Sequence, residues 1–437
     1  MLIGIDDTDS DEGMCTTYLA AVLAEELKNY GTVIGYPYLI RLNPTIPYKT
    51  RGNAALGIEL ELTDDSPKKK KDLVEFVSNK IQESAELTCE KTNPGAVFIF
   101  DGAYAAMREP LNHFFKKAVT DVIEIDDAKR LAADFESKYE EDVFHFTLKN
   151  GRGIIGALAV CGAILNPDWE ETYEYLAYRL KNKNTTRSVN ADSLILADEK
   201  TMPETWDTID RTRKTKPFPV CVPAGKDPVL FGIRGNSAEA IAAAAVFVVS
   251  EEIERHQIFK TNQGTDAHLI FAETVLEMEP LHSYILNGTV ISESETIEGG
   301  HDIFKIHDKN GDILTCAAFE PTGDFRHIIR KLIMGDEIRI FGSLKNETFN
   351  LEKIKINRLA DAFQTENPIC PSCEKRMKSA GAGQGFRCLD CKTKAAEKVT
   401  TKKVRPITIG YYEVPPSARR HLSKPLIRYS KEELEAE

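Results

Sequence analysis

Four cysteines near the C-terminal end constrain the fold of this chain more than any other feature. Their spacing is Cys370-x₂-Cys373-x₁₄-Cys388-x₂-Cys391. Two Cys-x-x-Cys pairs at this separation are typical of a zinc ribbon, in which four thiolates bind one Zn²⁺ tetrahedrally. Two disulfide bonds are the alternative, which a reducing compartment disfavours. Because four thiolates leave no open coordination position, we expect the zinc to be structural.

A second unusual feature lies at the N-terminus, where an apolar stretch runs into acidic and hydroxyl side chains. Leu2–Ile5 indicates a strand, residues 6–12 contain five acids, and an apolar helix follows from Tyr18. Acids this close repel one another, and Mg²⁺ bound to carboxylate oxygens relieves the repulsion. Gly13 and residues 14–17 then place backbone N–H groups and hydroxyls at a helix start, where phosphate oxygens bind well. The segment therefore predicts a metal–triphosphate site.

The same residues allow other interpretations. Asp, Ser and Gly between a strand and a helix are ordinary turn and capping residues, so the cluster could be a solvated loop. Asp7-Thr8-Asp9 resembles the Asp-x-Asp core of haloacid dehalogenase-type phosphatases. Asp11 stands where that pattern requires Thr or Val, so we exclude this class.

Charge is segregated along the chain. The net charge of −12 argues against nucleic acid as a partner. Between Cys370 and Arg428, however, fourteen Lys and Arg face four Asp and Glu, whereas residues 1–369 hold forty-one basic and sixty acidic side chains. A basic zinc module on an acidic body predicts that a phosphate backbone meets the C-terminal end. A solubilising tail is the alternative.

Length and composition restrict the class of protein. The 437 residues predict three or four domains, and 42% hydrophobic and 28% charged residues are typical of soluble globular proteins. The longest apolar runs, Ile154–Leu165 and Ile241–Val249, are shorter than the roughly eighteen residues of a membrane helix. The acidic start does not resemble a signal peptide, so we expect a cytoplasmic protein without membrane contact.

The first part of the chain alternates strand and helix patterns. Its first hundred residues have the order β-α-β-β-α-β of a split βαβ, ferredoxin-like sandwich. Gly151-Arg152-Gly153 indicates a glycine-rich turn before Ile154–Leu165, which fits a helix or a strand, and Tyr173–Leu180 closes this part. The expected strands are Leu2–Ile5, Val33–Leu42, Ala54–Leu62, Ala96–Phe100 and Phe144–Leu148, and the expected helices are Thr17–Tyr30, Lys71–Leu87, Leu111–Val122 and Ala128–Lys138.

A second α/β unit is expected from about Ser193 to His282. Leu194–Leu196 and Val229–Ile233 indicate strands, and Ala238–Ile253 indicates an Ala-rich helix. The pattern from 286 to 358 is all-β, with a tight hairpin turn at 308–312. Its expected strands are Gly288–Ser292, Asp302–His307, Leu314–Phe319, Glu337–Phe341 and Phe349–Ile356, with a helix at Phe325–Ile333. Five strands with a helix before the fourth predict an OB-fold, a common oligonucleotide binder, and a barrel without a ligand is the alternative.

One short motif occurs in both α/β units. Arg51-Gly52-Asn53 and Arg234-Gly235-Asn236 each join an extended segment to an Ala-rich one. Gly permits close backbone approach, and Arg offers a two-pronged donor for phosphate or carboxylate. The repeat indicates paired anion sites, although three residues also recur by chance.

Three longer motifs together resemble one enzyme family. They are Gly4-Ile5-Asp6-Asp7-Thr8-Asp9-Ser10, Gly13-Met14-Cys15-Thr16-Thr17 and the thirteen residues from Arg41 to Asn53, followed by the OB region and the cysteine ribbon. This series is similar, end to end, to the archaeal isoleucine-tRNA 2-agmatinylcytidine synthetases. The resemblance implies a multidomain α+β protein: an ATP-binding kinase-like catalytic domain (1–192), a ferredoxin-like α/β domain (193–282), an OB-fold (283–362), and a zinc ribbon with a basic tail (363–437).

The resemblance also implies a reaction. ATP, agmatine and the minor isoleucine tRNA give a wobble cytidine whose C2 oxygen is replaced by agmatine, so that the anticodon reads AUA rather than AUG, and AMP and phosphate are released. The family's autophosphorylated threonine corresponds to Thr16, and its Mg²⁺ and ATP ligands fall within Asp6–Asp9. Phosphorylation of the C2 oxygen creates a leaving group that an amine can displace.

Phosphoryl transfer depends on positioning and charge neutralisation, which gives each candidate residue a role. Asp6, Asp7 and Asp9 would bind Mg²⁺, and Lys49 and Arg51 would counter developing charge, unless these two only form a salt bridge in their loop. The target cytosine must leave its stack, so we expect a pocket for it. The remaining ATP or phosphate candidates are Thr8, Ser10, Gly13, Met14, Cys15, Thr16, Thr17, Gly52 and Asn53.

The agmatine pocket stays unassigned. It requires carboxylates and an aromatic face, and Trp206, Asp207 and Asp210 fit by residue type only, because an amphipathic helix has the same composition. A non-catalytic RNA-binding factor with a structural cation site is the alternative to the ligase, and a related ligase that uses another amine is a third hypothesis.

Overall fold

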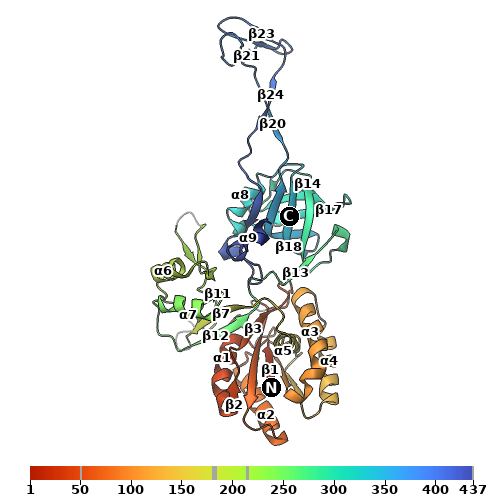
Figure 1. Ribbon diagram of the computed structural model, residues 1–437, viewed down its shortest axis with the longest axis vertical. Helices are drawn as coiled ribbons and strands as arrows, with labels where there is room; N and C mark the ends of the chain where they lie inside the picture. The colour runs from red at the N-terminus through yellow and green to blue at the C-terminus, as the bar shows by residue number, and fades with distance from the viewer. Residues whose placement is uncertain (50–51, 180–184, 213–215, 436–437) are drawn as a thin grey trace.

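The computed structural model describes residues 1–49, 52–179, 185–212 and 216–435. Along its long axis an α/β part is followed by a β-barrel and by a small cysteine-rich tip, which two strands carry away from the barrel (Figure 1). Among the described residues, no helix combines the length and the apolar character needed to cross a membrane.

The first unit contains an antiparallel sheet in which the strands of two split βαβ units alternate. Its strands are β1 (Leu2–Asp6), β2 (Gly31–Val33), β3 (Tyr38–Arg41), β4 (Ala54–Leu62), β5 (Gly95–Ile99) and β6 (Val143–Thr147). The order is β6-β5-β1-β4-β3 with antiparallel neighbours, and β2 pairs with β4. The order β5-β1-β4-β3 agrees with the split βαβ pattern of the first hundred residues. The expected strand Val33–Leu42 is divided, because the chain turns at Gly35 with a φ of +62°.

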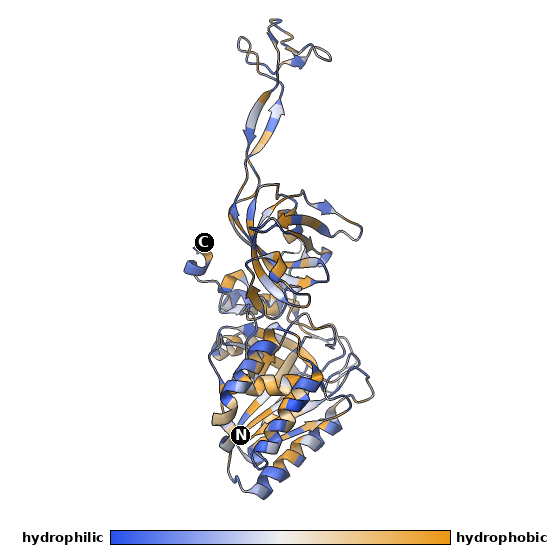
Figure 2. Ribbon diagram, turned by 90° about the vertical axis from the view of Figure 1, so that its right-hand side faces the viewer, coloured by the Kyte–Doolittle hydropathy of each residue, from blue (hydrophilic) through white to orange (hydrophobic). Residues whose placement is uncertain are grey.

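Helices cover both faces of this sheet. They are α1 (Thr16–Glu26) and α2 (Pro67–Ser84) on one face, and α3 (Tyr104–Thr120), α4 (Ile125–Lys138) and α5 (Ile154–Leu165) on the other. Side chains of a strand alternate between faces, so β1 buries Ile3 and Ile5 against α1 and α2 but Leu2 against the other helices. Hydrophobic residues accordingly lie in the middle of this part, behind helices with hydrophilic outer faces (Figure 2).

The second unit continues the same sheet. Its strands are β7 (Thr172–Tyr178), β8 (Thr205–Trp206), β11 (Val229–Gly235) and β12 (Arg255–Thr261), in the order β12-β7-β11-β8. β12 pairs in parallel with β3, which joins the two units into one ten-stranded sheet. β7, at the end of the first expected part, therefore pairs within the second unit. The helices α6 (Ala191–Thr201) and α7 (Ala238–Val246) cover this end of the sheet.

Two expectations for this unit are wrong. Leu194–Leu196 is not a strand but part of α6, which begins where the Asn190 side chain accepts a hydrogen bond from the Ser193 N–H. The Ala-rich helix ends at Val246 instead of Ile253. The chain leaves it to reach α6, where the Val249 N–H donates to Ser193 Oγ at 2.9 Å.

The β-barrel has the predicted hairpin turn and the predicted order of strands and helix, but its first strand begins at Ser283 instead of Gly288 and its helix ends at Ile329 instead of Ile333. Its strands β14 (Ser283–Val290), β16 (Asp302–His307), β17 (Ile313–Ala318), β19 (Thr348–Arg358) and β18 (Glu337–Lys345) follow one another around the barrel. The β14–β18 and β14–β16 pairings close it, and β17 pairs in parallel with β19. α8 (Phe325–Ile329) lies between β17 and β18 in sequence, and Asp308–Asp312 form the hairpin turn.

The remaining chain leaves the barrel and returns to it. β20 (Ala362–Glu366) and β24 (Val399–Lys403) form an antiparallel stalk, which carries the tip strands β21 (Lys378–Ser379), β22 (Phe386–Arg387) and β23 (Lys394–Ala395) (Figure 1). After the stalk, β25 (Gly410–Glu413) adds to β19. Residues 414–430, here called the strap, then run back to the α/β part, where the Gly264 N–H donates to the His421 carbonyl.

Candidate active site

A cavity of about 820 Å³ lies where the two α/β units and the strap meet. The N-terminal motif, the loop after β3, the turn between α3 and α4, and strands β7 and β11 line it, and the strap contributes His421. Of the predicted site residues, the cavity contains Asp6, Asp7, Asp9, Cys15, Thr16, Thr17, Lys49, Gly52 and Asn53.

The acidic cluster, defined as Asp6, Asp7 and Asp9, lies at the end of β1. Asp7 has a left-handed φ of 62°, a conformation that Asp tolerates better than most residues. Asp6 packs against the start of α5, where a Cβ on Gly156 would lie 2.1 Å from Asp6 Oδ2. Arg152, from the predicted glycine-rich turn, places Nη2 2.8 Å from Asp7 Oδ2.

Two carboxyls of this cluster, those of Asp6 and Asp7, are costly to ionise. Burial, followed by the charge of Asp7, raises the pKa of Asp6 well above its usual value. Burial also raises the pKa of Asp7 to about 7, although Arg152 opposes the shift. A divalent cation would offset this cost. Among the described residues, the four cysteines of the ribbon are the one set of three or more candidate metal ligands whose ligand atoms all lie within 4.8 Å of one another. The carboxylate oxygens of Asp6, Asp7 and Asp9 are therefore farther apart than the cysteine sulfurs.

Hydroxyl groups border the acidic cluster at the start of α1. Thr16 is the first residue of this helix, and its Oγ1 accepts a hydrogen bond of 3.1 Å from Thr8 Oγ1. The first N–H groups of a helix have no partner within the helix, so they suit an anion. The other predicted phosphate ligands do not line the cavity: Thr8 lies behind Thr16, Ser10 and Gly13 close a small turn, and Met14 packs against two apolar cores.

A basic cluster, defined as Arg41, Lys49 and Arg234, shares the cavity with the acids. Glu174 joins its two arginines, with Oε1 3.1 Å from Arg234 Nε and Oε2 3.8 Å from Arg41 Nη2. Burial lowers the pKa of Arg41 to about 10, while Glu174 opposes the shift and Asp9 contributes in the same sense as Glu174. The cavity therefore brings anionic and cationic side chains together.

The loop after β3 supplies the other candidates. Lys49 lines the cavity and donates to the Pro44 carbonyl, and burial lowers its pKa to about 8. Gly52 allows the close approach predicted for it, because a Cβ there would lie 2.5 Å from Arg41 Nη1. Asn53 Nδ2 donates to the Asn43 carbonyl and so closes the loop. Arg51 lies outside the described residues.

The three residues considered for agmatine are not on a helix. Trp206 lies in β8 and Asp210 in β9 (Ile209–Asp210), with Asp207 in the turn between them. Asp207 lines the cavity but forms an ion pair with Arg419 of the strap. Asp210 accepts a hydrogen bond from Ser417 Oγ. Of the motif Arg234-Gly235-Asn236, only Arg234 lines the cavity.

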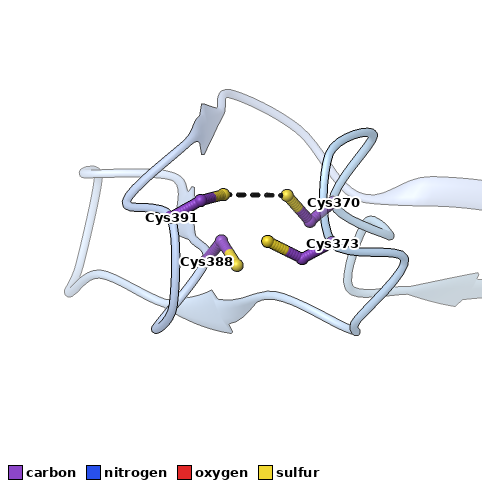
Figure 3. A group of neighbouring side chains, drawn as sticks. All are labelled: Cys370, Cys373, Cys388 and Cys391. Carbon is purple, nitrogen blue, oxygen red and sulfur yellow. Dashed lines mark hydrogen bonds between the residues drawn. The ribbon is translucent and has the colours of Figure 1, made fainter.

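The four cysteines converge as the spacing predicts. Their sulfurs point toward one another from two knuckles, with 3.3 Å between Sγ of Cys370 and Sγ of Cys391 (Figure 3). Tetrahedral zinc with Zn–S bonds of about 2.3 Å requires sulfurs about 3.8 Å apart, which fits this cluster. The knuckles are equivalent: Glu374 and Lys392, each following the second cysteine, are left-handed and donate back to the carbonyl of the first.

The comparisons with known proteins cover nearly the whole chain. Three family models match, described as the TiaS TCKD domain (residues 2–143), the TiaS FLD domain (151–268) and the TiaS C-terminal zinc ribbon domain (367–407). A relative from Methanosarcina acetivorans, named as the isoleucine-tRNA 2-agmatinylcytidine synthetase TiaS, is 52% identical over 430 residues, covering 98% of this chain and 97% of the relative. The chain belongs to the TiaS family.

Solved TiaS structures have the same architecture. A crystal structure of apo TiaS is 47% identical, with a TM-score of 0.87, and covers 99% of this chain and 98% of its own. A crystal structure of TiaS in complex with an isoleucine tRNA, AMPCPP and agmatine is 44% identical, with a TM-score of 0.83 and the same coverage. The resemblance inferred from three motifs is therefore confirmed.

Several residues of the cavity were not predicted as site residues. Arg152 could have been found from the glycine-rich turn, whereas Arg234 belongs to the repeated Arg-Gly-Asn motif that indicated an anion site. Glu174 and His421 carry no local signal, because their neighbours in the cavity come from distant parts of the chain.

Proposed function

We propose that this member of the TiaS family conjugates agmatine to C2 of the wobble cytidine of the minor isoleucine tRNA at the expense of ATP. It is an ATP-dependent ligase that modifies tRNA. Curated relatives at 40–52% identity bear the name of this synthetase, and a TiaS relative is known in complex with an isoleucine tRNA, an ATP analogue and agmatine. The observation that carries the proposal is the single cavity in which the acidic cluster, the start of α1 and the basic cluster meet.

Mg²⁺ fits the acidic cluster as part of a metal–triphosphate complex. Mg²⁺ usually takes one or two protein carboxylates and completes its shell with phosphate oxygens and water. Carboxylates that burial makes costly to ionise, but that do not form a closed set of ligands, suit such a shared site. We assign Mg²⁺ binding to Asp6, Asp7 and Asp9.

The groups around this site have complementary roles. Thr16 and Thr17, with the first N–H groups of α1, would hold the triphosphate, and Thr16 is the candidate for autophosphorylation. Arg41, Arg234 and Lys49 would neutralise negative charge on a phosphoryl group or on the tRNA. Arg51 keeps its predicted role as a second cation of the loop. Phosphorylation of the cytidine C2 oxygen then allows the agmatine amine to displace phosphate.

The proposal also includes a fold for each domain. We assign a kinase-like catalytic domain to residues 1–192, a ferredoxin-like domain to 193–282 and an OB-fold to 283–362. Closure of the five barrel strands, with the order β14-β16-β17-β19-β18, supports the OB assignment. Pairing of β7 with β11 and β12 favours an earlier start of the second domain. Four free thiolates in the ribbon suit a reducing cytoplasm.

The zinc ribbon is proposed to bind Zn²⁺ and to contact the tRNA. Its four sulfurs fit a closed structural site, and its exposed lysines and arginines suit a phosphate backbone.

The decisive assay measures AMP formed from ATP in the presence of the minor isoleucine tRNA and agmatine, with mass spectrometry of the modified nucleoside. We expect Asp7→Ala to abolish AMP formation and to leave tRNA binding unchanged. Asp11→Ala is the matched control, because Asp11 is exposed and pairs with exposed Lys91 outside the cavity. If the wild type binds tRNA but consumes no ATP, the chain is an RNA-binding factor instead. Incorporation of another amine would indicate a related ligase.

A further inference from the structure

The strap joins the barrel to both α/β units. Leu422 is fully buried in the core of the first unit, and its carbonyl accepts hydrogen bonds from the N–H groups of Thr265 and Asp266. Near its end, Arg428 lies over the Trp206 ring, with its Nη2 2.8 Å from Glu170 Oε1. The strap is therefore held at two points, one in the core of the first unit and one at Trp206 of the second unit.

Buried ion pairs fix its first half. Arg419 is 3% exposed and forms ion pairs with Asp207 and Glu413, the latter at 2.6 Å. Because these partners belong to the second unit and to β25, Arg419 ties the strap to both.

His421 is the part of the strap that lines the cavity. Arg234 donates a hydrogen bond to its Nδ1, with 2.7 Å from Nη2. Since arginine can only donate, Nδ1 must be the unprotonated nitrogen and Nε2 carries the proton. Burial, together with the charges of Arg41, Arg234 and Lys49, lowers the pKa of His421 well below its usual value, which agrees with a neutral ring.

His421 gives Arg234 a second hydrogen-bond acceptor besides Glu174. Glu174 accepts from Nε of Arg234, while its second oxygen accepts from Gln263 Nε2 at 2.7 Å. The imidazole thus holds the end of the guanidinium that Glu174 does not. Its ring also packs against Gly52, where a Cβ would lie 3.1 Å from the ring carbon Cδ2. A neutral acceptor orients the guanidinium without cancelling its charge, unlike a second carboxylate.

We propose that His421 is a positioning residue for the ligase reaction, which fixes Arg234 so that its charge faces the anionic ligand in the cavity. The inference rests on the proposed function, because it assumes that phosphate or tRNA occupies this cavity. It makes the segment after the zinc ribbon a necessary part of the catalytic site.

The test compares His421→Ala with His421→Asn in the full chain. Removal of the acceptor should lower kcat for AMP formation by at least about 10-fold, the cost of a lost hydrogen bond to a charged group. Asn places its Oδ1 near the position of Nδ1, so we expect it to restore much of kcat. KM for agmatine, which is a cation and not a ligand of Arg234, should change little in either variant.

Controls separate this role from a structural one. Ile427→Ala changes an exposed strap residue and should leave kcat at the wild-type value. The thermal midpoints of both His421 variants show whether the strap stays docked. If His421→Ala is folded and as active as the wild type, or if Asn restores nothing while Ala is inactive, the inference is wrong. If the wild type itself forms no AMP, the proposed function has failed instead.

Discussion

Gly156 provides a test of how strictly the acidic cluster must be positioned. It lies in the first turn of α5, and a Cβ at this position would be 2.1 Å from Asp6 Oδ2 and 2.8 Å from Asp6 Cβ. Cβ atoms in proteins essentially never approach another heavy atom closer than 3.0 Å. Because the interior is close-packed, Gly156→Ala must move the Asp6 carboxylate or the helix by about 1 Å.

The expected magnitudes differ for stability and for catalysis. Alanine stabilises a helix interior by about 1 kcal/mol relative to glycine, whereas overpacking of a tight core costs about 1–3 kcal/mol. The two effects oppose each other, so the free energy of unfolding should fall by no more than about 2 kcal/mol. A displacement of about 1 Å in a phosphoryl-transfer site can lower kcat about 100-fold. Gly156→Ala should therefore be a folded protein with little activity.

The assay follows AMP formation with tRNA and agmatine, together with urea unfolding. Gly162→Ala is the matched control on the same helix, because its Cβ would lie 2.2 Å from the Leu111 carbonyl oxygen, away from the cavity. It should lose stability but keep kcat near the wild-type value.

A double-mutant cycle tests the cause. If Gly156→Ala acts by displacing Asp6, it should not weaken Mg²⁺-dependent ATP binding any further in an Asp6→Ala background. A Gly156→Ala protein with wild-type kcat would refute the reasoning, because the position of Asp6 would then be unimportant.

Two further predictions concern the C-terminal half. Cys370→Ser with Cys373→Ser should abolish zinc binding and unfold the tip, which weakens tRNA binding while ATP binding persists; unchanged tRNA affinity in a filter-binding assay would contradict this. Burial alone would raise the pKa of Glu352, but the charges of His268 and Arg420 lower it to about 2. Glu352 therefore stabilises the fold above its unfolded pKa of about 4.3, a contribution of about 3 kcal/mol that is lost as the pH falls toward 2. Urea unfolding at pH 6 and pH 3 should show a smaller difference for Glu352→Gln than for the wild type.

Local signals in the sequence were sufficient for much of the fold. β4 has the predicted bounds, Ala54–Leu62, because apolar and acidic residues alternate in its second half and polar residues lie at both of its ends. The hairpin at Asp308–Asp312 and the two cysteine knuckles were predicted for the same reason, since each depends on a few consecutive residues with specific backbone requirements. A local signal was missed in α6, where Leu194–Leu196 has a strand-like composition but follows the Asn190 cap. A distant contact decides the end of α7, because the chain after Val246 turns to α6, where the Val249 N–H donates to Ser193 Oγ.

The cavity could be predicted only in part. The acidic residues and Thr16 are close together in sequence and precede a helix, so their chemistry can be read from one segment. The basic cluster cannot be read in this way, because Arg41 and Arg234 are connected through Glu174 on β7. Only the sheet order β3-β12-β7-β11 brings these strands together, and parallel pairing of β12 with β3 leaves no local pattern.

The charge argument shows where composition alone misleads. The basic excess after Cys370 was interpreted as one surface for a phosphate backbone. Between residues 370 and 403, the stalk and tip do carry nine exposed Lys and Arg against three acids. The five basic residues from 405 to 428 instead form ion pairs with acids of the barrel, the α/β units and the C-terminal segment itself: Arg405 with Asp336, Arg419 with Asp207 and Glu413, Arg420 with Glu352, Lys424 with Glu170 and Glu433, and Arg428 with Glu170.

These two groups of cations have different physical consequences. Exposed lysines on the tip can release counterions when they meet RNA, so they should determine the salt dependence of tRNA binding. The buried arginines of the strap are already neutralised, and removal of one leaves an unpaired carboxylate in the protein. We therefore expect the basic side chains of the ribbon to contribute to tRNA binding, whereas those of the strap hold the segment that carries His421 at the cavity.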